Sequence, residues 1–367
     1  MPLGNSILIS ADSHYTEPGD IFINRVPSKF KDVVPRMERM EKGDAWVYEG
    51  FKEPINFGLN VCAGNEPENM KPWVNFDEIR AGGYDPKARL EEQDRDGISG
   101  EVMYPTPRLS VAMYATEDVD LHLSIVRAYN DWQSEFCEHA PNRFCGLVMM
   151  PNRGGPKATI EEMERVLGRP GMRGVTMGCY PNGTTTIKPE DDMVWEYLED
   201  KGIPVNIHVA LSVGRPGEHK VKLPGWGRFF DVPTRMIEMI FSGVFDRYPN
   251  LEIMFAEVDF GWLPYVKEQI DNNYQRLEPT NKFGLQKMPS DYIDRHIHLG
   301  YMTDSFGVRN MDLVNPERVL WGSDYPHISA DYPFSWRTIQ SSTIGLNQKV
   351  KDLITYKNAA RMYGFDI

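Results

Sequence analysis

The sequence lacks the features that mark several large classes of protein. It has four cysteines, at positions 62, 137, 145 and 179, and no two of them show C-x-x-C spacing. A disulfide framework is therefore not expected, and so few thiols in 367 residues are typical of a reduced, intracellular protein. No apolar run approaches the roughly 18 residues of a membrane span, and no charged segment followed by an apolar one opens the chain. We expect a cytoplasmic protein without a membrane partner.

Clusters of basic residues are also missing. The chain carries 40 lysines and arginines against 53 aspartates and glutamates, a formal net charge of −13. Nonspecific binding to nucleic acid requires a basic surface, so a nucleic-acid partner is not expected. A small-molecule substrate is the expected partner.

Eight short apolar runs recur along the chain, and most are followed by a segment with helical periodicity. Their near-continuous apolar character suits parallel strands that are buried on both faces. Strands alternating with helices predict an α/β fold, specifically a (β/α)8 TIM-type barrel, with a doubly wound sheet as the alternative. The predicted strands are 6–14, 100–106, 143–151, 174–180, 204–210, 251–257, 297–302 and 319–326, and the predicted helices are 87–96, 120–140, 156–167, 190–201, 232–246, 264–276, 305–314 and 349–362.

Two segments interrupt this alternation. Residues 15–85 and 211–231 are rich in proline, glycine and aromatic residues and have no helical period. They follow the first and fifth predicted strands, and long loops in a compact domain are usually lids or binding loops. We therefore expect one domain, 1–367, with long insertions after strands 1 and 5.

Side chains that bind metals stand at the ends of three predicted strands. Asp12 and His14 end the first strand, His208 ends the fifth, and Asp324 ends the eighth. In a (β/α)8 barrel these strand ends meet on the face that carries the active site. Residues from both ends of the chain are therefore predicted to share one ion.

Each of these residues alone has an ordinary explanation, such as a turn aspartate or a packed histidine. Their joint occurrence at three strand ends favours a metal site. A mixed set of imidazoles and carboxylates suits Zn²⁺, Mn²⁺ or Fe²⁺ better than Mg²⁺ or Ca²⁺. We expect a divalent transition metal, with zinc first in order of preference.

Five segments of the chain resemble the amidohydrolase superfamily, and within it the amidohydrolase-2 branch that includes aminocarboxymuconate-semialdehyde decarboxylase and related aromatic-acid decarboxylases. The similarity covers nearly the whole chain, and the first and fourth segments are the most specific. The segments are ADSHYTEP at 11–18, NIH at 206–208, FAEVDFGWLP at 255–264, LWGSDYPH at 320–327 and KNAARMYG at 357–364.

The resemblance implies that Asp12, His14, His208 and Asp324 form the metal shell. It also implies that Asp324 exchanges a proton with metal-bound water, whose pKa a divalent ion lowers to about 7. Two departures stand out. Many relatives open with H-x-H where this chain has Asp12-x-His14, and decarboxylases of the branch commonly have a histidine where this chain has Glu257.

Further polar residues lie near the predicted shell. Glu17 and Glu257 are each a candidate general base or metal ligand. Otherwise Glu17 caps the loop that opens at Pro18, and Glu257 pairs with an arginine beneath the barrel rim. His327 follows Pro326 and is a candidate catalytic residue that orients substrate, or a further metal ligand, or else an exposed loop histidine. Arg108, after strand 2, is a candidate to bind a substrate carboxylate in bidentate fashion, or else an arginine without a partner.

These observations leave three functions open. The first is a metal-dependent hydrolase or nonoxidative decarboxylase acting on a small carboxylated, cyclic or aromatic compound. The second is a dinuclear iron or iron/manganese oxygenase on the same barrel, in which Glu17, Glu257 and His327 serve a second metal. The third is a noncatalytic, metal-binding subunit of a hetero-oligomer. The resemblance implies a homo-oligomer for the first.

Overall fold

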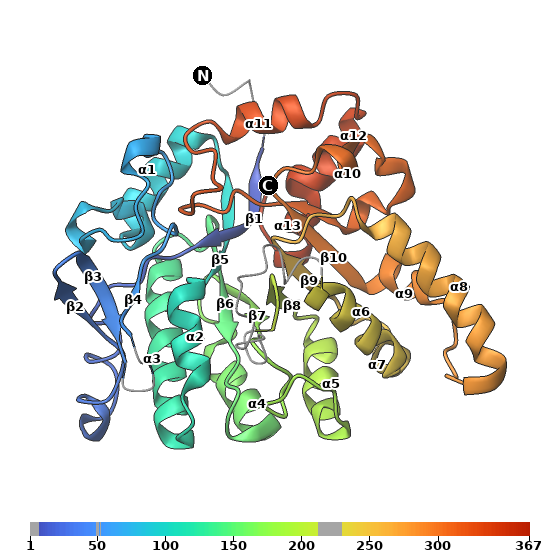
Figure 1. Cartoon of the computed structure of the whole chain (residues 1–367), viewed down its shortest axis with the longest axis horizontal. Coiled ribbons are helices and arrows are strands. Elements are labelled where there is room, and N and C mark those ends of the chain that lie inside the picture. The colour runs from blue at the N-terminus through green and yellow to red at the C-terminus, as the bar shows by residue number, and fades with distance from the viewer. Residues whose placement is uncertain (1–6, 49–50, 52, 212–229) are drawn as a thin grey trace.

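Eight parallel strands form a nearly closed barrel at the centre of the molecule (Figure 1). The computed structural model of the chain describes residues 7–48, 51, 53–211 and 230–367. Eight strands follow one another in the order β1-β5-β6-β7-β8-β9-β10-β11, each parallel to its neighbour. The predicted (β/α)8 barrel is confirmed. The strands are Ile9–His14 (β1), Gly100–Tyr104 (β5), Phe144–Met149 (β6), Met172–Thr176 (β7), Val205–His208 (β8), Ile253–Ala256 (β9), Ile297–Tyr301 (β10) and Val319–Trp321 (β11).

Helices surround the strands and account for most of the predicted helical segments. Three further helices, α2, α9 and α11, were not predicted, because they are short and begin within proline-containing segments. Within the described ranges, none of the helices is both long and apolar enough to cross a bilayer. The helices are Pro86–Asp96 (α1), Pro107–Ala115 (α2), Val119–Glu138 (α3), Gly155–Val166 (α4), Asp192–Lys201 (α5), Val232–Phe241 (α6), Val244–Arg247 (α7), Leu263–Asn281 (α8), Pro289–His296 (α9), Ser305–Arg309 (α10), Ser335–Ser342 (α11), Gln348–Asp352 (α12) and Asn358–Tyr363 (α13).

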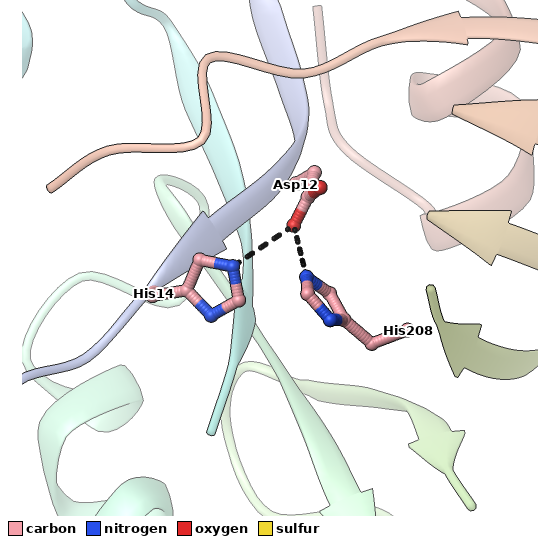
Figure 2. A group of neighbouring side chains, drawn as sticks. All are labelled: Asp12, His14 and His208. Atoms are coloured by element: carbon pink, nitrogen blue, oxygen red, sulfur yellow. Dashed lines mark ion pairs between the residues drawn. The ribbon is translucent and has the colours of Figure 1, made fainter. Parts of the chain in front are cut away.

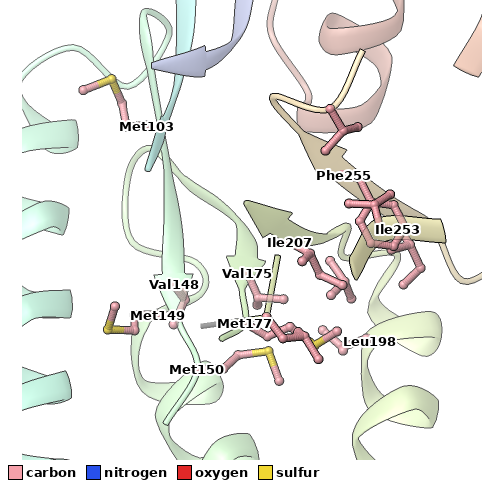
Figure 3. Packing of buried hydrophobic residues seen from close by; sticks show 14 of the residues in the cluster. Met103, Val148, Met149, Met150, Val175, Met177, Leu198, Ile207, Ile253 and Phe255 are labelled. Atoms are coloured by element: carbon pink, nitrogen blue, oxygen red, sulfur yellow. The ribbon is translucent and has the colours of Figure 1, made fainter. Parts of the chain in front are cut away.

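Alternation of side chains along the strands divides the core into two layers. Residues on the outer side of the barrel pack against the helices, and Figure 3 shows Val175, Ile207 and Ile253 in this layer with Leu198 of α5. Residues on the inner side form a second cluster with α13 and Phe365, which close one end of the barrel. The inner cluster contains Ile9, Ala11, Val102, Tyr104, Cys145, Leu147, Met254, Ala256, Leu320, Ala359, Ala360, Met362, Tyr363 and Phe365. The opposite end of the barrel is therefore the one left for polar groups.

The first insertion contains regular structure that the sequence pattern did not reveal. Its strands Arg36–Met40 (β2), Gly43–Val47 (β3) and Ile55–Asn56 (β4) pair antiparallel in a separate sheet beside α2 and α3. These strands are too short and too polar to stand out by periodicity. Of the second predicted insertion, 211–231, residues 212–229 lie outside the described residues.

Contacts between β1 and the segment after β11 close the barrel. The backbone N–H of His14 donates to Tyr325 O over 2.6 Å, and the N–H of Asp324 donates to Asp12 O over 2.8 Å. A bulge interrupts β1 just before these contacts. Ile9 pairs with Gly100 and His14 with Tyr104, so five steps along β1 match four along β5. Ile9 and Ala11 face the barrel interior, so regular alternation would point Asp12 outward. The bulge shifts the alternation by one residue and turns Asp12 and His14 toward the interior as well.

A buried arginine on α1 binds β1 and β5 on the outer side of the barrel. Arg89 of α1 is only 1% exposed and donates to both carboxylate oxygens of Glu101 on β5, over 2.6 and 3.1 Å. It also donates to the backbone oxygens of His14 and Gly82, each over 3.1 Å. One side chain thus links α1, β1 and β5.

Replacing Arg89 with methionine should lower the free energy of unfolding by about 3–5 kcal/mol, because Glu101 is left as an unpaired buried charge. Urea unfolding followed by circular dichroism measures this. The matched control is Arg36→Met, which removes an exposed ion pair with Glu38 and should cost about 0–1 kcal/mol. Equal losses in the two variants would contradict the structural role of Arg89.

Candidate active site

Three of the predicted metal ligands meet at the polar end of the barrel. Figure 2 shows the imidazoles of His14 and His208 facing one carboxylate oxygen of Asp12. The Nε2 atom of His14 lies 3.4 Å from Asp12 Oδ1, and that of His208 lies 3.6 Å from the same oxygen. Asp12 and His14 are buried, and the side chain of His208 is 13% exposed. The structure therefore joins β1 and β8 at one point, as the strand-end argument predicts.

Asp324 reaches the same group from the other end of the chain. Its Oδ1 atom lies 3.3 Å from Nε2 of His14, and its backbone N–H is bound to Asp12 O. Asp324, Asp12 and Glu257 also form a set whose carboxylate oxygens lie within 4.8 Å of one another. All four residues predicted as a metal shell thus lie together.

The facing atoms of these residues lack ordinary partners. Among the described residues, no hydrogen bond satisfies either oxygen of Asp12, Nε2 of His14, Nε2 of His208 or Oδ1 of Asp324. Buried polar atoms without hydrogen bonds are costly, and buried charges normally pair or bind a metal. The ligand atoms of Asp12, His14 and His208 lie within 4.8 Å of one another, and Asp324 lies 3.3 Å from His14 beside them, so a cation held here would satisfy these atoms and the residues present fit a metal ion.

Distances and tautomers agree with that fit. Two atoms that bind one tetrahedral zinc ion at about 2.0–2.1 Å lie about 3.3–3.4 Å apart, close to the separations observed here. Nδ1 of His14 lies 3.2 Å from the backbone oxygen of Pro105, which can only accept a hydrogen bond. That contact holds a proton on Nδ1 and leaves Nε2, on the side of the carboxylates, as the nitrogen that would bind a metal, as in metal-binding histidines.

Electrostatics at the site also favour a cation. Burial disfavours ionisation of Asp12, yet His208 and His14 outweigh it and hold the pKa of Asp12 below its usual value. Burial likewise opposes a charge on His14, but Asp12 and Asp324 raise the pKa of its imidazole to about 10. The carboxylates that stabilise an imidazolium would equally stabilise a metal ion.

Glu257 stands beside this group. Its Oε2 atom lies 3.5 Å from Nε2 of His208, and its side chain is 24% exposed. The backbone of Glu257 has φ of 60°, and Val209 and Asp324, also just beyond barrel strands, have φ of 59° and 56°. Left-handed backbone in residues other than glycine costs about 1–3 kcal/mol and gathers at functional sites. The strain marks the same strand ends as the polar cluster.

His327 is buried against the site rather than exposed in a loop. Its Nδ1 atom lies 2.7 Å from Oδ1 of Asp324, and its ring stacks on that of His14 with centroids 3.9 Å apart. Burial lowers the pKa of the His327 imidazole. Nε2 lies 2.8 Å from Nδ2 of Asn60, a residue of the first insertion that sequence reasoning missed. No local pattern marks Asn60, which lies 267 residues before its partner.

Glu17 lies one layer away from the cluster. Its Oε1 atom accepts hydrogen bonds from the backbone N–H of Thr106 and from the hydroxyl of Tyr129, each over 2.9 Å. Burial raises the pKa of Glu17 to about 7. Within the described part of the chain, Glu17 is not in the sets of side chains that gather closely enough to hold an ion. Its role as a metal ligand stays a prediction.

Arg108 is engaged with the first insertion. Its Nε donates to the backbone oxygen of Asn56 over 2.8 Å, and its Nη2 donates to the side-chain oxygen of the same residue. The guanidinium therefore anchors β4 to α2. Binding of a substrate carboxylate by Arg108 stays a prediction.

A narrow cavity of about 20 Å³ lies beside His208. Its described walls are mostly apolar and aromatic, with a few neutral polar groups and no arginine or lysine. Side chains of these kinds are typical of sites that bind small cyclic molecules. The lining residues are Tyr104, Pro105, Pro107, Ser110, Tyr114, Met149, Thr176, Met177, His208 and Ala210.

Gly322 allows β11 to approach the metal cluster closely. A Cβ atom added there would lie 2.6 Å from Cβ of Asp12, which is closer than real Cβ contacts. Gly322→Ala should therefore displace Asp12 and weaken metal binding at least tenfold while the fold survives. Metal affinity is measured by competition with a chromogenic chelator. The control is Gly345→Ala, where the added Cβ meets nothing within 4 Å but a φ of 92° strains the backbone, so that it reports the effect of destabilisation without a contact at Asp12. Unchanged affinity in Gly322→Ala would contradict the placement of Asp12 in the site.

Comparison with known proteins places the chain in a family. Its residues 65–365 match the sequence profile of the amidohydrolase family. It is 26% identical to 2-amino-3-carboxymuconate-6-semialdehyde decarboxylase of Dictyostelium discoideum over 68% of this chain and 69% of the relative. It is 23% identical to gamma-resorcylate decarboxylase of Rhizobium radiobacter over 76% of this chain and 86% of the relative. An amidohydrolase from Mycobacterium avium subsp. paratuberculosis K-10 superimposes over 99% of both chains, with 19% identity and a TM-score of 0.78. The chain belongs to the amidohydrolase family.

Proposed function

We propose that this protein is a metal-dependent, nonoxidative decarboxylase of a small aromatic carboxylate. The observation that carries the proposal is the convergence of buried carboxylate and imidazole atoms that lack hydrogen bonds, from β1, β8 and the segment after β11, beside a mostly apolar cavity. The named relatives support the reaction class, because they are decarboxylases of small carboxylated compounds. The barrel of 2,6-dihydroxybenzoate decarboxylase from Rhizobium also superimposes on 98% of this chain, with a TM-score of 0.67.

Asp12, His14, His208 and Asp324 would hold the metal, and we propose zinc. A dihydroxybenzoic acid decarboxylase from Polaromonas, similar in fold with a TM-score of 0.64, was solved with manganese, which makes Mn²⁺ the first alternative. When bound, such an ion polarises the substrate's oxygen atoms and stabilises developing negative charge. The site in this chain supplies two carboxylates to balance the charge of one divalent ion.

The remaining steps belong to this chain's own side chains. Decarboxylation breaks the bond between the ring carbon and the carboxylate, leaves its electron pair on the ring, releases CO₂ and adds one proton to that carbon. Tyr104 and Met177, which line the cavity, would contact the substrate ring. Asp324, with His327 at 2.7 Å, would store and deliver the proton. Glu257 occupies the position next to His208 from which a second proton carrier could act.

The first test of this function uses purified protein loaded with zinc or manganese and a panel of hydroxybenzoates, beginning with 2,6-dihydroxybenzoate. We expect release of CO₂ and loss of the substrate's ultraviolet absorbance. His208→Ala should lose most of its metal and turnover while circular dichroism stays unchanged, because it removes one ligand. His139→Ala, at the C-terminal end of α3, is the matched control.

The same panel separates decarboxylation from hydrolysis and from a noncatalytic role. Amides and esters of the same aromatic acids replace the free acids in parallel reactions. Cleavage of these derivatives without CO₂ release would make the protein a hydrolase. No turnover of either kind by fully metal-loaded protein would refute the enzymatic proposal.

A second candidate function follows from how the ligands overlap. The acidic and imidazole groups form three sets, Asp12/His14/His208, His14/Asp324/His327 and Asp12/Glu257/Asp324, which share members. Sharing of carboxylates between neighbouring sets is the arrangement that two adjacent metals need, because bridging oxygens offset the repulsion of the ions. The candidate is a dinuclear iron or iron/manganese oxygenase.

Metal stoichiometry decides between the two functions. Wild-type protein produced with both zinc and iron available should contain one ion per chain, and Glu257→Gln should retain it. Elemental analysis of protein purified without chelator measures this. The control is Glu317→Gln, a residue just before the start of β11, at the end of the strand opposite the site. Two ions in the wild type, falling to one in Glu257→Gln, would favour the dinuclear oxygenase.

A further inference from the structure

We propose that Asn60 is a positioning residue that holds the proton of His327 on Nδ1, facing Asp324. The effect on turnover rests on the proposed decarboxylase function, whereas the effect on the tautomer does not. The role of Asn60 would make His327 a proton carrier and not a metal ligand.

The argument begins with the contact between the two side chains. Nδ2 of Asn60 lies 2.8 Å from Nε2 of His327. An amide nitrogen donates hydrogen bonds and accepts none, so Nε2 must offer its lone pair. A neutral imidazole carries one proton, which then resides on Nδ1.

The second ring nitrogen of His327, Nδ1, lies beside the carboxylate of Asp324. Nδ1 lies 2.7 Å from Oδ1 of Asp324, so the protonated nitrogen is adjacent to the carboxylate. The ring also stacks on His14 with an interplanar angle of 15°, which limits its rotation about the side-chain axis. His327 therefore presents a proton to the site from a fixed direction.

Asn60 is itself held in place by the loop after β11. The backbone N–H of Ile328 donates to Leu59 O over 2.9 Å, and that of Ala63 donates to Pro326 O over 3.0 Å. Asn60 lies between the two bonded residues of the insertion, and His327 lies between the two bonded residues of the loop. The first insertion is thus fastened to the very segment that carries His327.

Arg108 fixes the beginning of the same stretch. It binds Asn56, whose side-chain oxygen also accepts the backbone N–H of Gly58 over 3.1 Å. The stretch 56–63 therefore runs from α2 to the active-site loop with both ends anchored. Because both ends are anchored, the side-chain amide of Asn60 within this stretch is held against Nε2 of His327.

The opposite tautomer would have a different consequence. With the proton on Nε2, the lone pair of Nδ1 would face Asp324 and His14, and His327 could complete a second set of metal ligands. A carboxylate at position 60 accepts hydrogen bonds only and would enforce that state. Asn60→Asp replaces one nitrogen with an oxygen, and it therefore tests whether His327 acts as a proton carrier or as a metal ligand.

The experiment is nitrogen NMR of the zinc-loaded, full-length protein with ¹⁵N-labelled histidine. Long-range ¹H–¹⁵N correlations report which ring nitrogen carries the proton, and the missing signals of His327→Gln identify His327 among the eight histidines. The variants are Asn60→Asp and Asn69→Asp, the latter an exposed position on the same insertion. Turnover and metal content are measured on the same samples.

We expect an unprotonated Nε2 in the wild type and in Asn69→Asp, and a protonated Nε2 in Asn60→Asp. Turnover of Asn60→Asp should fall about 10²-fold, the lower end of the range for general acid–base catalysis. A protonated Nε2 in the wild type would overturn the proposal even if no variant folds. An unchanged tautomer in Asn60→Asp would also overturn it. Absence of decarboxylation with the expected tautomers would instead refute the proposed function and leave the role of Asn60 standing.

Discussion

The backbone contact between β1 and the segment that follows β11 is the constraint on which the site depends. The hydrogen bond from Asp324 N–H to Asp12 O and that from His14 N–H to Tyr325 O join the two ends of the chain. They bring carboxylates separated by more than 300 residues to one point and close the barrel in the same step. Because Gly322 leaves no space beside Asp12, any change in this contact moves a candidate ligand directly.

The polar groups gathered by this contact would be unfavourable without a compensating charge. Buried carboxylates and imidazoles lose hydration, and here their inward-facing atoms make ion-pair contacts in place of hydrogen bonds. The protein accepts left-handed backbone at Glu257 and Asp324 in the same region, which adds strain. Arg89 binds Glu101 and the backbone of His14, and so holds β1 from the side facing α1. This rigid support offsets the free energy lost by dehydration and strain, and it positions the candidate ligands in advance of metal binding.

The first insertion contacts the candidate active site directly. Arg108 anchors its strand β4, and Asn60 contacts His327 directly. In a family whose members share the barrel, such an insertion can alter the proton route while the strand-end ligands stay in place. His327 in turn lies 2.7 Å from Asp324, so the insertion reaches the proposed proton carriers through one side chain.

Some of these features follow from the amino-acid sequence alone. Apolar runs with helical segments between them are enough to predict eight strands, and the ends of parallel strands in a barrel must meet, so Asp12, His14, His208 and Asp324 can be grouped by their positions in the sequence. Periodicity cannot reveal the short polar strands β2–β4, nor the bulge that turns Asp12 inward, since both depend on pairing with distant segments. Tertiary packing decides the contacts of His327 with Asp324 and Asn60. It also decides the hydrogen bonds of Glu17 to Thr106 and Tyr129. Local sequence sets which residues end a strand, whereas the position of a loop side chain depends on whatever the rest of the fold places beside it.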